Sequence, residues 1–326
     1  MISGAMGISP PLRREYEIIV AIAIIAITIG SVYAAGRYLN LFQSSQTPTT
    51  TLQVVAGENF WGSLVSQLGG SHVSVTSVVN NPNTDPHSYE SNAADARAIA
   101  DANYVIVNGA GYDNWATGLI VANNNPHQKV LNVADLLGKK AGDNPHFWYG
   151  PGYVNQTVHQ MYLDLVGLDS ADATYYRQQY ASLNTSLGEY NHRIVEISQK
   201  FANTPVASTE SIFEYLATAC SLKLISPPEF MKAVAEGNDP TPADYATFQS
   251  QLINGTMPGN ATVLVYNEQT VTQLTLSLKA EAAKNGIPIV GVTETIQPPD
   301  ISFQTWMNAE LIQIQNALNA NALGKP

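Results

Sequence analysis

The chain has 326 residues, of which 45% are hydrophobic, and a formal net charge of −11 at pH 7. Its length predicts about two domains, at roughly 150 residues each, and its acidic balance argues against a nucleic-acid partner, which would require a basic surface. The single cysteine, Cys220, excludes an intramolecular disulfide and a zinc finger, so any metal must be held by His, Asp, Glu or backbone oxygen.

The N-terminal run from Ile18 to Gly36 is uncharged and rich in β-branched residues. As a helix it would span roughly 28 Å, close to the thickness of the hydrocarbon layer of a membrane. Two arginines precede it, so we expect the rest of the chain to lie outside the cytoplasm. Residues 1–40 are therefore predicted to be a signal or membrane anchor, and residues 41–51 a tether. A buried core helix is the alternative for the run, and cleavage after the small-residue site Val32–Ala34 would make the protein secreted.

Short apolar runs then alternate with helical patterns. Strands are expected over 52–56, 73–79, 104–107 and 129–133, and helices over 58–68 and 92–102. Strands that alternate with helices imply a parallel sheet with helices on both faces. We therefore expect an N-terminal lobe over residues 52–168, which a further helix over 153–166 completes.

A long helical pattern follows this lobe, from about Ser170 to Phe201, without proline and with one glycine, Gly188. A single helix of this length would span roughly 45 Å. Two ordinary helices, broken near Asn184 or Gly188, are the alternative. We favour one interlobe helix over residues 169–202, because it would join two lobes rigidly.

The alternation of strands and helices restarts after the long helix. Strands are expected over 205–208, 262–266 and 287–292, and helices over 212–220, 241–252, 269–285 and 303–322. Thr241 and Pro242 are typical of a helix start. The fold class predicted is therefore α/β, with two lobes that are each a parallel sheet flanked by helices. One long helix joins the lobes, the C-terminal lobe covers 203–326, and a membrane segment precedes them.

Four potential metal ligands follow predicted strands. His87 and His146 each come directly after a proline in a loop, and Glu210 and Glu294 each come two residues after a strand. Ligands of open parallel sheets bind at the carboxyl ends of the strands, so two lobes facing each other would bring the four side chains together. Two imidazoles and two carboxylates suit Mn²⁺, Fe²⁺ or Zn²⁺. Taken alone, each histidine could be a surface loop residue, Glu210 a solvated residue at a helix start and Glu294 a plain loop acid.

Several stretches carry a family resemblance. They are DPHSYESNAADARAIADANYVIVNGAGYDNW from Asp85, NPHFWYGPGYVNQTVHQMYLDL from Asn144, SADATYYRQQYASLNTSL from Ser170, STESIFEYLATACSL from Ser208 and IPIVGVTETI from Ile287. In this order and spacing they resemble the cluster-9 solute-binding proteins of ABC importers for zinc and manganese. The resemblance covers roughly residues 52–323.

The resemblance implies that His87, His146, Glu210 and Glu294 hold the metal. Zinc-type members usually have histidine where this chain has Glu210, whereas manganese-type members usually have glutamate, and the family usually has aspartate where this chain has Glu294. The histidine-rich loop of zinc-type members is also missing. We therefore favour Mn²⁺ or Fe²⁺ over Zn²⁺ as the transported ion.

The resemblance further implies a metal-capturing protein, not an enzyme, that delivers its ion to an ABC permease. We expect a monomer, located outside the cytoplasm and held at the membrane by the N-terminal segment. An exported metal-dependent hydrolase on the same ligands is one alternative, although no HExxH motif is present. An adhesin-like interaction module on the same fold is another.

Overall fold

The computed structural model describes residues 51–84, 86–253 and 259–323, together with isolated helical positions between residues 19 and 31. The chain divides into two compact units, Met1–Thr50 and Thr51–Pro326. The predicted membrane segment and tether fall largely outside the described residues. Among the residues that are described, no helix is both long and apolar enough to cross a membrane.

The N-terminal half of the second unit, residues 51–168, contains a four-stranded parallel sheet. Its order is β2-β1-β3-β4, so the first strand lies inside the sheet. The strands are β1 (Leu52–Glu58), β2 (Val73–Val79), β3 (Tyr104–Val107) and β4 (Lys129–Asn132). All four residues of β3 are buried, as expected for a central parallel strand with both faces covered.

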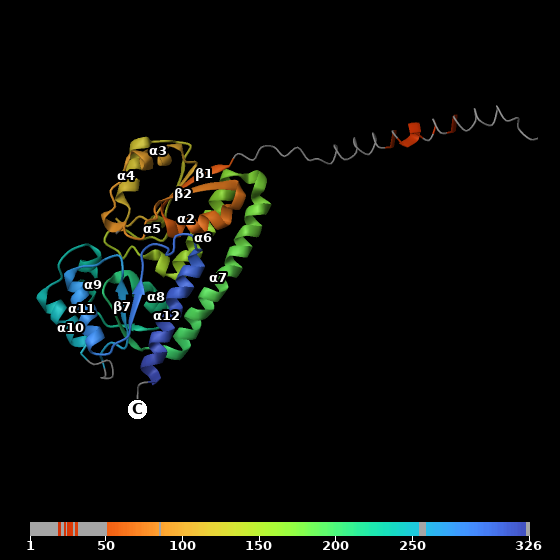
Figure 1. The fold of residues 1–326 in the computed structure, drawn as a ribbon. Helices are drawn as coiled ribbons and strands as arrows, with labels where there is room; N and C mark the ends of the chain where they lie inside the picture. The colour runs from red at the N-terminus through yellow and green to blue at the C-terminus, as the bar shows by residue number, and fades with distance from the viewer. Residues whose placement is uncertain are drawn as a thin grey trace, which may run out of the picture. The chain divides into compact units, whose positions relative to one another are not determined.

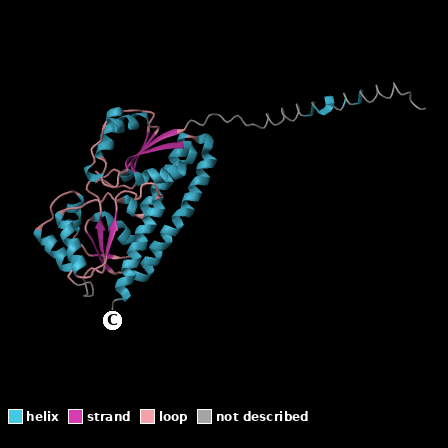
Figure 2. Ribbon diagram, viewed as in Figure 1, coloured by secondary structure: helices cyan, strands magenta, loops and turns pink. Residues whose placement is uncertain are grey.

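Helices cover this sheet (Figure 2). They are α2 (Asn59–Gly69), α3 (Ala93–Asp101), α4 (Asn114–Asn123), α5 (Val133–Leu136) and α6 (Pro151–Leu168). Asn92 and Asp95 form a capping box at the start of α3, which satisfies backbone N–H groups that the helix leaves without partners. Helix α4 was not predicted from the sequence.

One uninterrupted helix, α7 (Ala173–Phe201), follows the first half (Figure 1). It has 29 residues, so the alternative of two helices broken near Asn184 or Gly188 was wrong. The last helix, α12 (Phe303–Leu323), packs along it. The Arg193 guanidinium of α7 donates to Asn308 at 2.7 Å and to Gln315 at 2.9 Å, both on α12.

The C-terminal half, residues 203–323, contains a second four-stranded parallel sheet of order β6-β5-β7-β8. Its strands are β5 (Pro205–Ser208), β6 (Lys223–Leu224), β7 (Leu264–Asn267) and β8 (Ile289–Val292). Its helices are α8 (Glu214–Ala219), α9 (Pro228–Ala235), α10 (Pro242–Gln251) and α11 (Gln273–Lys284). The α/β class with two parallel sheets and a long helix is thus confirmed, and the two sheets have equivalent strand orders.

Two details of the second half differ from the sequence prediction. The helix expected from Gln269 begins at Gln273, because the side chain of Thr272 caps the backbone N–H of Thr275 and fixes the helix start there. Residues before it remain in a loop at the end of β7. The short elements β6 and α9 were also not predicted, whereas Thr241 caps α10 as expected.

Candidate metal centre

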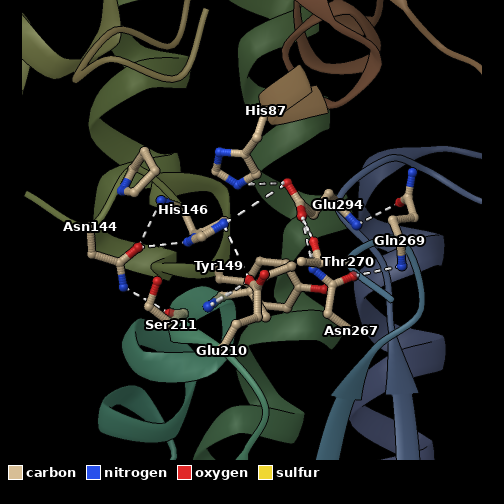
Figure 3. Close-up of polar contacts among 12 residues, drawn as sticks. His87, Asn144, His146, Tyr149, Glu210, Ser211, Asn267, Gln269, Thr270 and Glu294 are labelled. Carbon is tan, nitrogen blue, oxygen red and sulfur yellow. Dashed lines mark hydrogen bonds and ion pairs between the residues drawn. The ribbon is translucent and has the colours of Figure 1, made fainter. Parts of the chain in front are cut away.

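The four predicted ligands lie on short segments at the carboxyl ends of strands. His87 is in a 3₁₀ turn after β2, and His146 directly precedes a second turn, Phe147–Tyr149. Glu210 and Glu294 follow β5 and β8 in the other half. Between the two halves, the structure brings ligand atoms of His87, His146 and Glu294 within 4.8 Å of one another, and Glu210 adjoins this group beside His146 (Figure 3).

Glu294 is the centre of this group. One carboxylate oxygen, Oε2, lies 3.3 Å from Nε2 of His87 and 4.0 Å from Nε2 of His146. Nε2 of His146 is also 3.5 Å from Oε1 of Glu210. His146, Glu210 and Glu294 are fully buried, whereas the side chain of His87 is 19% exposed. His87 is therefore the member of the group that solvent can reach.

The other oxygen of Glu294 is held by two neutral donors of the same half. The side-chain amide of Asn267 donates to Oε1 at 2.8 Å, and the hydroxyl of Thr270 donates to it at 3.0 Å. The hydroxyl of Tyr112 donates to Oε2 at 2.7 Å from the opposite half. None of these three residues was predicted from the sequence. Their signal is weak: Asn267 ends a buried strand, and Tyr112 stands in a glycine-rich turn after another.

The turn that carries Tyr112 requires glycine at one position. Gly109 has φ 77°, and an added Cβ would collide with the side chain of Asn132 and approach Ala134 within 2.9 Å. Only glycine adopts this backbone conformation without strain. The carboxylate of Asp113 then accepts the backbone N–H groups of Asn108 and Gly109 at 2.6 and 2.8 Å, which fixes the turn.

Asn144 sets the orientation of the His146 ring. Its side-chain oxygen accepts from the backbone N–H of His146 at 3.1 Å and lies 2.7 Å from Nδ1 of the same residue. Because that oxygen is an acceptor, Nδ1 carries the ring proton, and Nε2 presents a lone pair to the other ligands. A hydrogen bond that fixes the tautomer in this way is typical of metal-binding histidines.

The aromatic segment after His146 is anchored in the core. Phe147, Trp148 and Tyr149 are buried, and the Trp148 ring stacks on Phe60 of α2 with ring centroids 4.0 Å apart.

Nε2 of His146 and Oε2 of Glu210 are buried and have no hydrogen-bond partner within the described part of the chain. Burying such atoms without partners costs free energy, which a bound cation would offset.

The members of the group differ in pKa and therefore in charge. Burial lowers the pKa of His146 to about 3, so its imidazole is neutral. Burial and the neighbouring negative charge of Glu294 raise the pKa of Glu210 to about 8. Burial also opposes ionisation of Glu294, but His87, His146 and Tyr112 together bring its pKa below the usual carboxyl value. The group therefore holds one carboxylate, Glu294, in its charged form without any ion.

A cavity of about 840 Å³ opens beside the group, and His87, Tyr112 and Asn144 are part of its lining. Its charged side chains are mostly acidic, with Asp143, Glu214, Glu229 and Glu236 against Lys139 and Lys232. A cleft with this excess of negative charge raises the local concentration of cations. It therefore provides a route to His87, the partly exposed member of the group.

A second cluster of possible ligands lies near the start of α7. Nδ1 of His72 is 3.0 Å from a carboxylate oxygen of Asp172, and the hydroxyl of Tyr176 donates to Asp169 at 2.9 Å. The side chains of His72, Asp169 and Asp172 are 16%, 23% and 30% exposed. These polar groups contact one another, so the cluster ties the start of β2 to α7, and we assign no ion to it.

Residues 54–317 match the family described as ZnuA, zinc-uptake complex component A, periplasmic. This stretch covers most of the chain. The chain belongs to this family. The resemblance seen in the sequence is thereby confirmed, and so is the prediction of a metal-binding component of an uptake system, located outside the cytoplasm and without enzymatic activity. The alternative of a metal-dependent hydrolase finds no support in this family.

An individual relative is also similar to this chain in sequence. A manganese-binding lipoprotein, MntA, from Halalkalibacterium halodurans is 28% identical over 176 residues, or 52% of this chain and 57% of the relative. The aligned stretch thus spans little more than half of that protein.

Two solved structures share the fold. The Mn-bound periplasmic metal-binding protein of Candidatus Liberibacter asiaticus has a TM-score of 0.67 at 16% identity and covers 81% of this chain and 98% of its own. The periplasmic zinc-binding protein TroA of Treponema pallidum has a TM-score of 0.68 at 14% identity, with coverage of 82% and 99%. At these identities the likeness concerns the fold alone.

Proposed function

We propose that this chain captures a divalent transition metal ion outside the cytoplasm, with His87, His146, Glu210 and Glu294 as its ligands, and passes the ion to an ABC permease. One observation carries the proposal. Ligand atoms of His87, His146 and Glu294 come within 4.8 Å of one another from the two halves, with Glu210 beside His146. A nitrogen of His146 and an oxygen of Glu210 are buried there without hydrogen-bond partners among the described residues.

The donor set favours Mn²⁺ or Fe²⁺ as the transported ion. Two nitrogen and two oxygen donors give the site more oxygen character than a site with three histidines, and carboxylates suit the harder ion. Zn²⁺ nevertheless binds such a set more tightly than Mn²⁺, as the Irving–Williams order requires. Supply of the ion, rather than affinity alone, then determines which metal the protein carries.

The chain organisation fits this function. We propose an N-terminal lobe over 52–168, an interlobe helix over 169–202 and a C-terminal lobe over 203–326, with the ion held between the lobes. The rigid α7 and its partner α12 would limit how far the lobes separate. We further propose that the protein acts as a monomer and that residues 1–40 anchor it to the membrane.

Metal titration tests the function. The melting temperature of the purified full chain is measured with Mn²⁺, Fe²⁺, Zn²⁺ or a chelator. At a free-ion concentration of 100 times Kd, binding stabilises the fold by about 2.7 kcal/mol, so the melting temperature rises with metal. No shift with any of the three ions would contradict metal capture, and an adhesin-like module that kept only the fold would give this result.

The ligand assignment needs its own test. His87→Ala removes a ligand from a partly exposed loop, so we expect weaker metal binding with little change in the melting temperature of the metal-free protein. Collapse of the metal-free fold in this variant would show that His87 has a structural role instead.

A further inference from the structure

The side chain of Gln269 supports the backbone that carries Glu294. Its oxygen, Oε1, accepts from the backbone N–H of Glu294 at 2.7 Å and from the backbone N–H of Thr295 at 2.9 Å. The hydroxyl of Thr295 donates to the same oxygen at 3.1 Å. Gln269 therefore helps to fix the position of the Glu294 segment relative to β7.

The other end of the same amide reaches the opposite half. Nε2 of Gln269 donates to the backbone carbonyl of Thr84 at 3.0 Å, three residues before His87. A single half-buried side chain thus contacts both the segment of Glu294 and the loop of His87. Nε2 of His87 and Oε2 of Glu294 lie 3.3 Å apart.

Gln269 is itself held in place by Asn267. Its backbone N–H donates to Oδ1 of Asn267 at 2.9 Å, and Nδ2 of the same asparagine donates to the Glu294 carboxylate at 2.8 Å. Figure 3 shows Gln269, Asn267 and Thr270 around Glu294, on the side away from His87. Movement of Gln269 would therefore disturb both the backbone and the carboxylate of Glu294.

We propose that Gln269 is a positioning residue that couples the two ligand loops, so that His87 and Glu294 take up and release the ion together. When the loop of His87 swings away, the bond to Thr84 breaks, and the amide is free to rotate out of its contacts with Glu294 and Thr295. The loosening of one ligand then weakens the other. This inference rests on the proposed function, because it concerns how the ion leaves the site.

The other ligand pair has a comparable link. Nδ2 of Asn144 donates to the backbone carbonyl of Ser211 at 2.8 Å, while its oxygen holds His146. Asn144 thus joins the segments of His146 and Glu210, and Gln269 joins those of Glu294 and His87. Because His87 is the member of the group that solvent can reach, the Gln269 link is the one on the accessible side of the site.

A neighbouring glutamine provides a matched control. Nε2 of Gln297 donates to the carbonyl of Pro82 at 3.4 Å, so it contacts the same loop as Gln269 does, and it is also half-buried. Among the described residues, the side chain of Gln297 makes no hydrogen bond with the backbone of Glu294. Gln297→Met therefore removes a loop contact without removing the coupling.

The test uses three variants of the full chain. Gln269→Met removes both ends of the amide, whereas Gln269→Glu keeps an oxygen that accepts from Glu294 and Thr295 but cannot donate to Thr84. Metal dissociation is followed by stopped-flow after mixing the Mn²⁺ or Zn²⁺ form with excess chelator. Hydrogen exchange of residues 80–88 and 293–296 is measured on the metal-free protein.

Coupling predicts a distinct pattern. Gln269→Met should raise the dissociation rate at least about tenfold, because changes within one binding site mostly alter the off-rate, and it should speed exchange in both segments. Gln269→Glu should speed exchange in 80–88 more than in 293–296. Gln297→Met should change the dissociation rate less than threefold, on the order of the scatter between neutral substitutions.

Three results would overturn the coupling. One is faster exchange in 293–296 alone in Gln269→Met, which would make Gln269 a local support of Glu294. Another is an unchanged dissociation rate in that variant, and the third is equal effects of Gln269→Met and Gln297→Met. Failure of the wild-type chain to bind any metal is a separate outcome that contradicts the proposed function, and the exchange data would still test the link between the loops.

Discussion

The hydroxyl of Tyr112 donates a 2.7 Å hydrogen bond to Oε2 of Glu294, the oxygen that also faces His87 and His146. The bond crosses from one half of the protein to the other. Burial and the charge of Glu294 raise the pKa of Tyr112 well above its usual value, so the hydroxyl stays protonated and remains a donor. Tyr112 therefore engages one lone pair of Oε2 and holds the carboxylate in place from the opposite half.

Removing this hydroxyl should weaken metal binding. In Tyr112→Phe the ring still packs beside Trp148, but Glu294 loses the contact that orients it. Partners of a metal ligand typically contribute a factor of about 10–100 in affinity, so we expect Kd to rise by that factor in competitive titration. Tyr104→Phe is the control, because this buried hydroxyl donates to Asp164 at the amino end of its strand, away from the ligands. Equal effects of both substitutions would contradict the role of Tyr112.

The placement of the four candidate side chains after strands was predicted from the sequence, whereas the residues that hold them were not. His87 and Glu294 stand out because a parallel sheet places the residues after its strands at one edge. Gln269 did not stand out, because the apolar pattern after it suggested an earlier helix start than the one that Thr272 fixes. Tyr112 was missed for a different reason: its hydrogen bond joins residues 182 positions apart, and such a pairing depends on how the two halves pack.

Asn144 provides a second test of the ligand geometry. Asn144→Leu removes the oxygen that lies 2.7 Å from Nδ1 of His146, so the ring can adopt either tautomer, and we expect metal affinity to fall by about 10–100-fold. Asn144→Asp keeps an acceptor at this position and should retain more of the affinity. Imidazole ¹⁵N shifts would report the tautomer directly. If Leu and Asp weaken binding equally, the bonds from Asn144 to Ser211 and Glu214 matter more than the tautomer does.

Replacement of Glu210 should change which metal is preferred. Glu210→His adds a nitrogen donor and removes a negative charge at a fully buried position. Nitrogen donors favour Zn²⁺, whereas carboxylates suit Mn²⁺, so the ratio of Zn²⁺ to Mn²⁺ affinity should rise, mainly through weaker Mn²⁺ binding. Competitive titration of both ions on one protein measures this ratio. Glu196→His makes the same change at an exposed position of α7 and should leave the ratio unchanged. An unchanged ratio in Glu210→His would argue against Glu210 as a ligand.

Glu310 predicts a pH dependence of stability. The hydroxyl oxygen of Tyr149 lies 2.6 Å from Oε2 of Glu310 and 2.9 Å from the carbonyl oxygen of Thr293. The single proton of the hydroxyl cannot serve both acceptors, so we expect Tyr149 to donate to Thr293 while a protonated Glu310 donates to Tyr149. Burial raises the pKa of Glu310 to about 8, in agreement with this arrangement.

The sign of the effect follows from the raised pKa. The unfolded chain releases the Glu310 proton above a pH of about 4.3, whereas the folded protein keeps it up to about pH 8. The stabilisation is therefore complete below the unfolded pKa and is lost as pH rises toward the folded pKa, at about 1.4 kcal/mol per pH unit.

Glu310→Gln keeps an acceptor for the N–H of Thr293 and a donor for Tyr149 without a titrating proton. Relative to the wild type, its free energy of unfolding should therefore rise between pH 5 and 8 in denaturant titrations. Glu196→Gln, at an exposed position of α7, should follow the wild type throughout, and parallel curves for Glu310→Gln and the wild type would show that Glu310 is ionised in the folded protein.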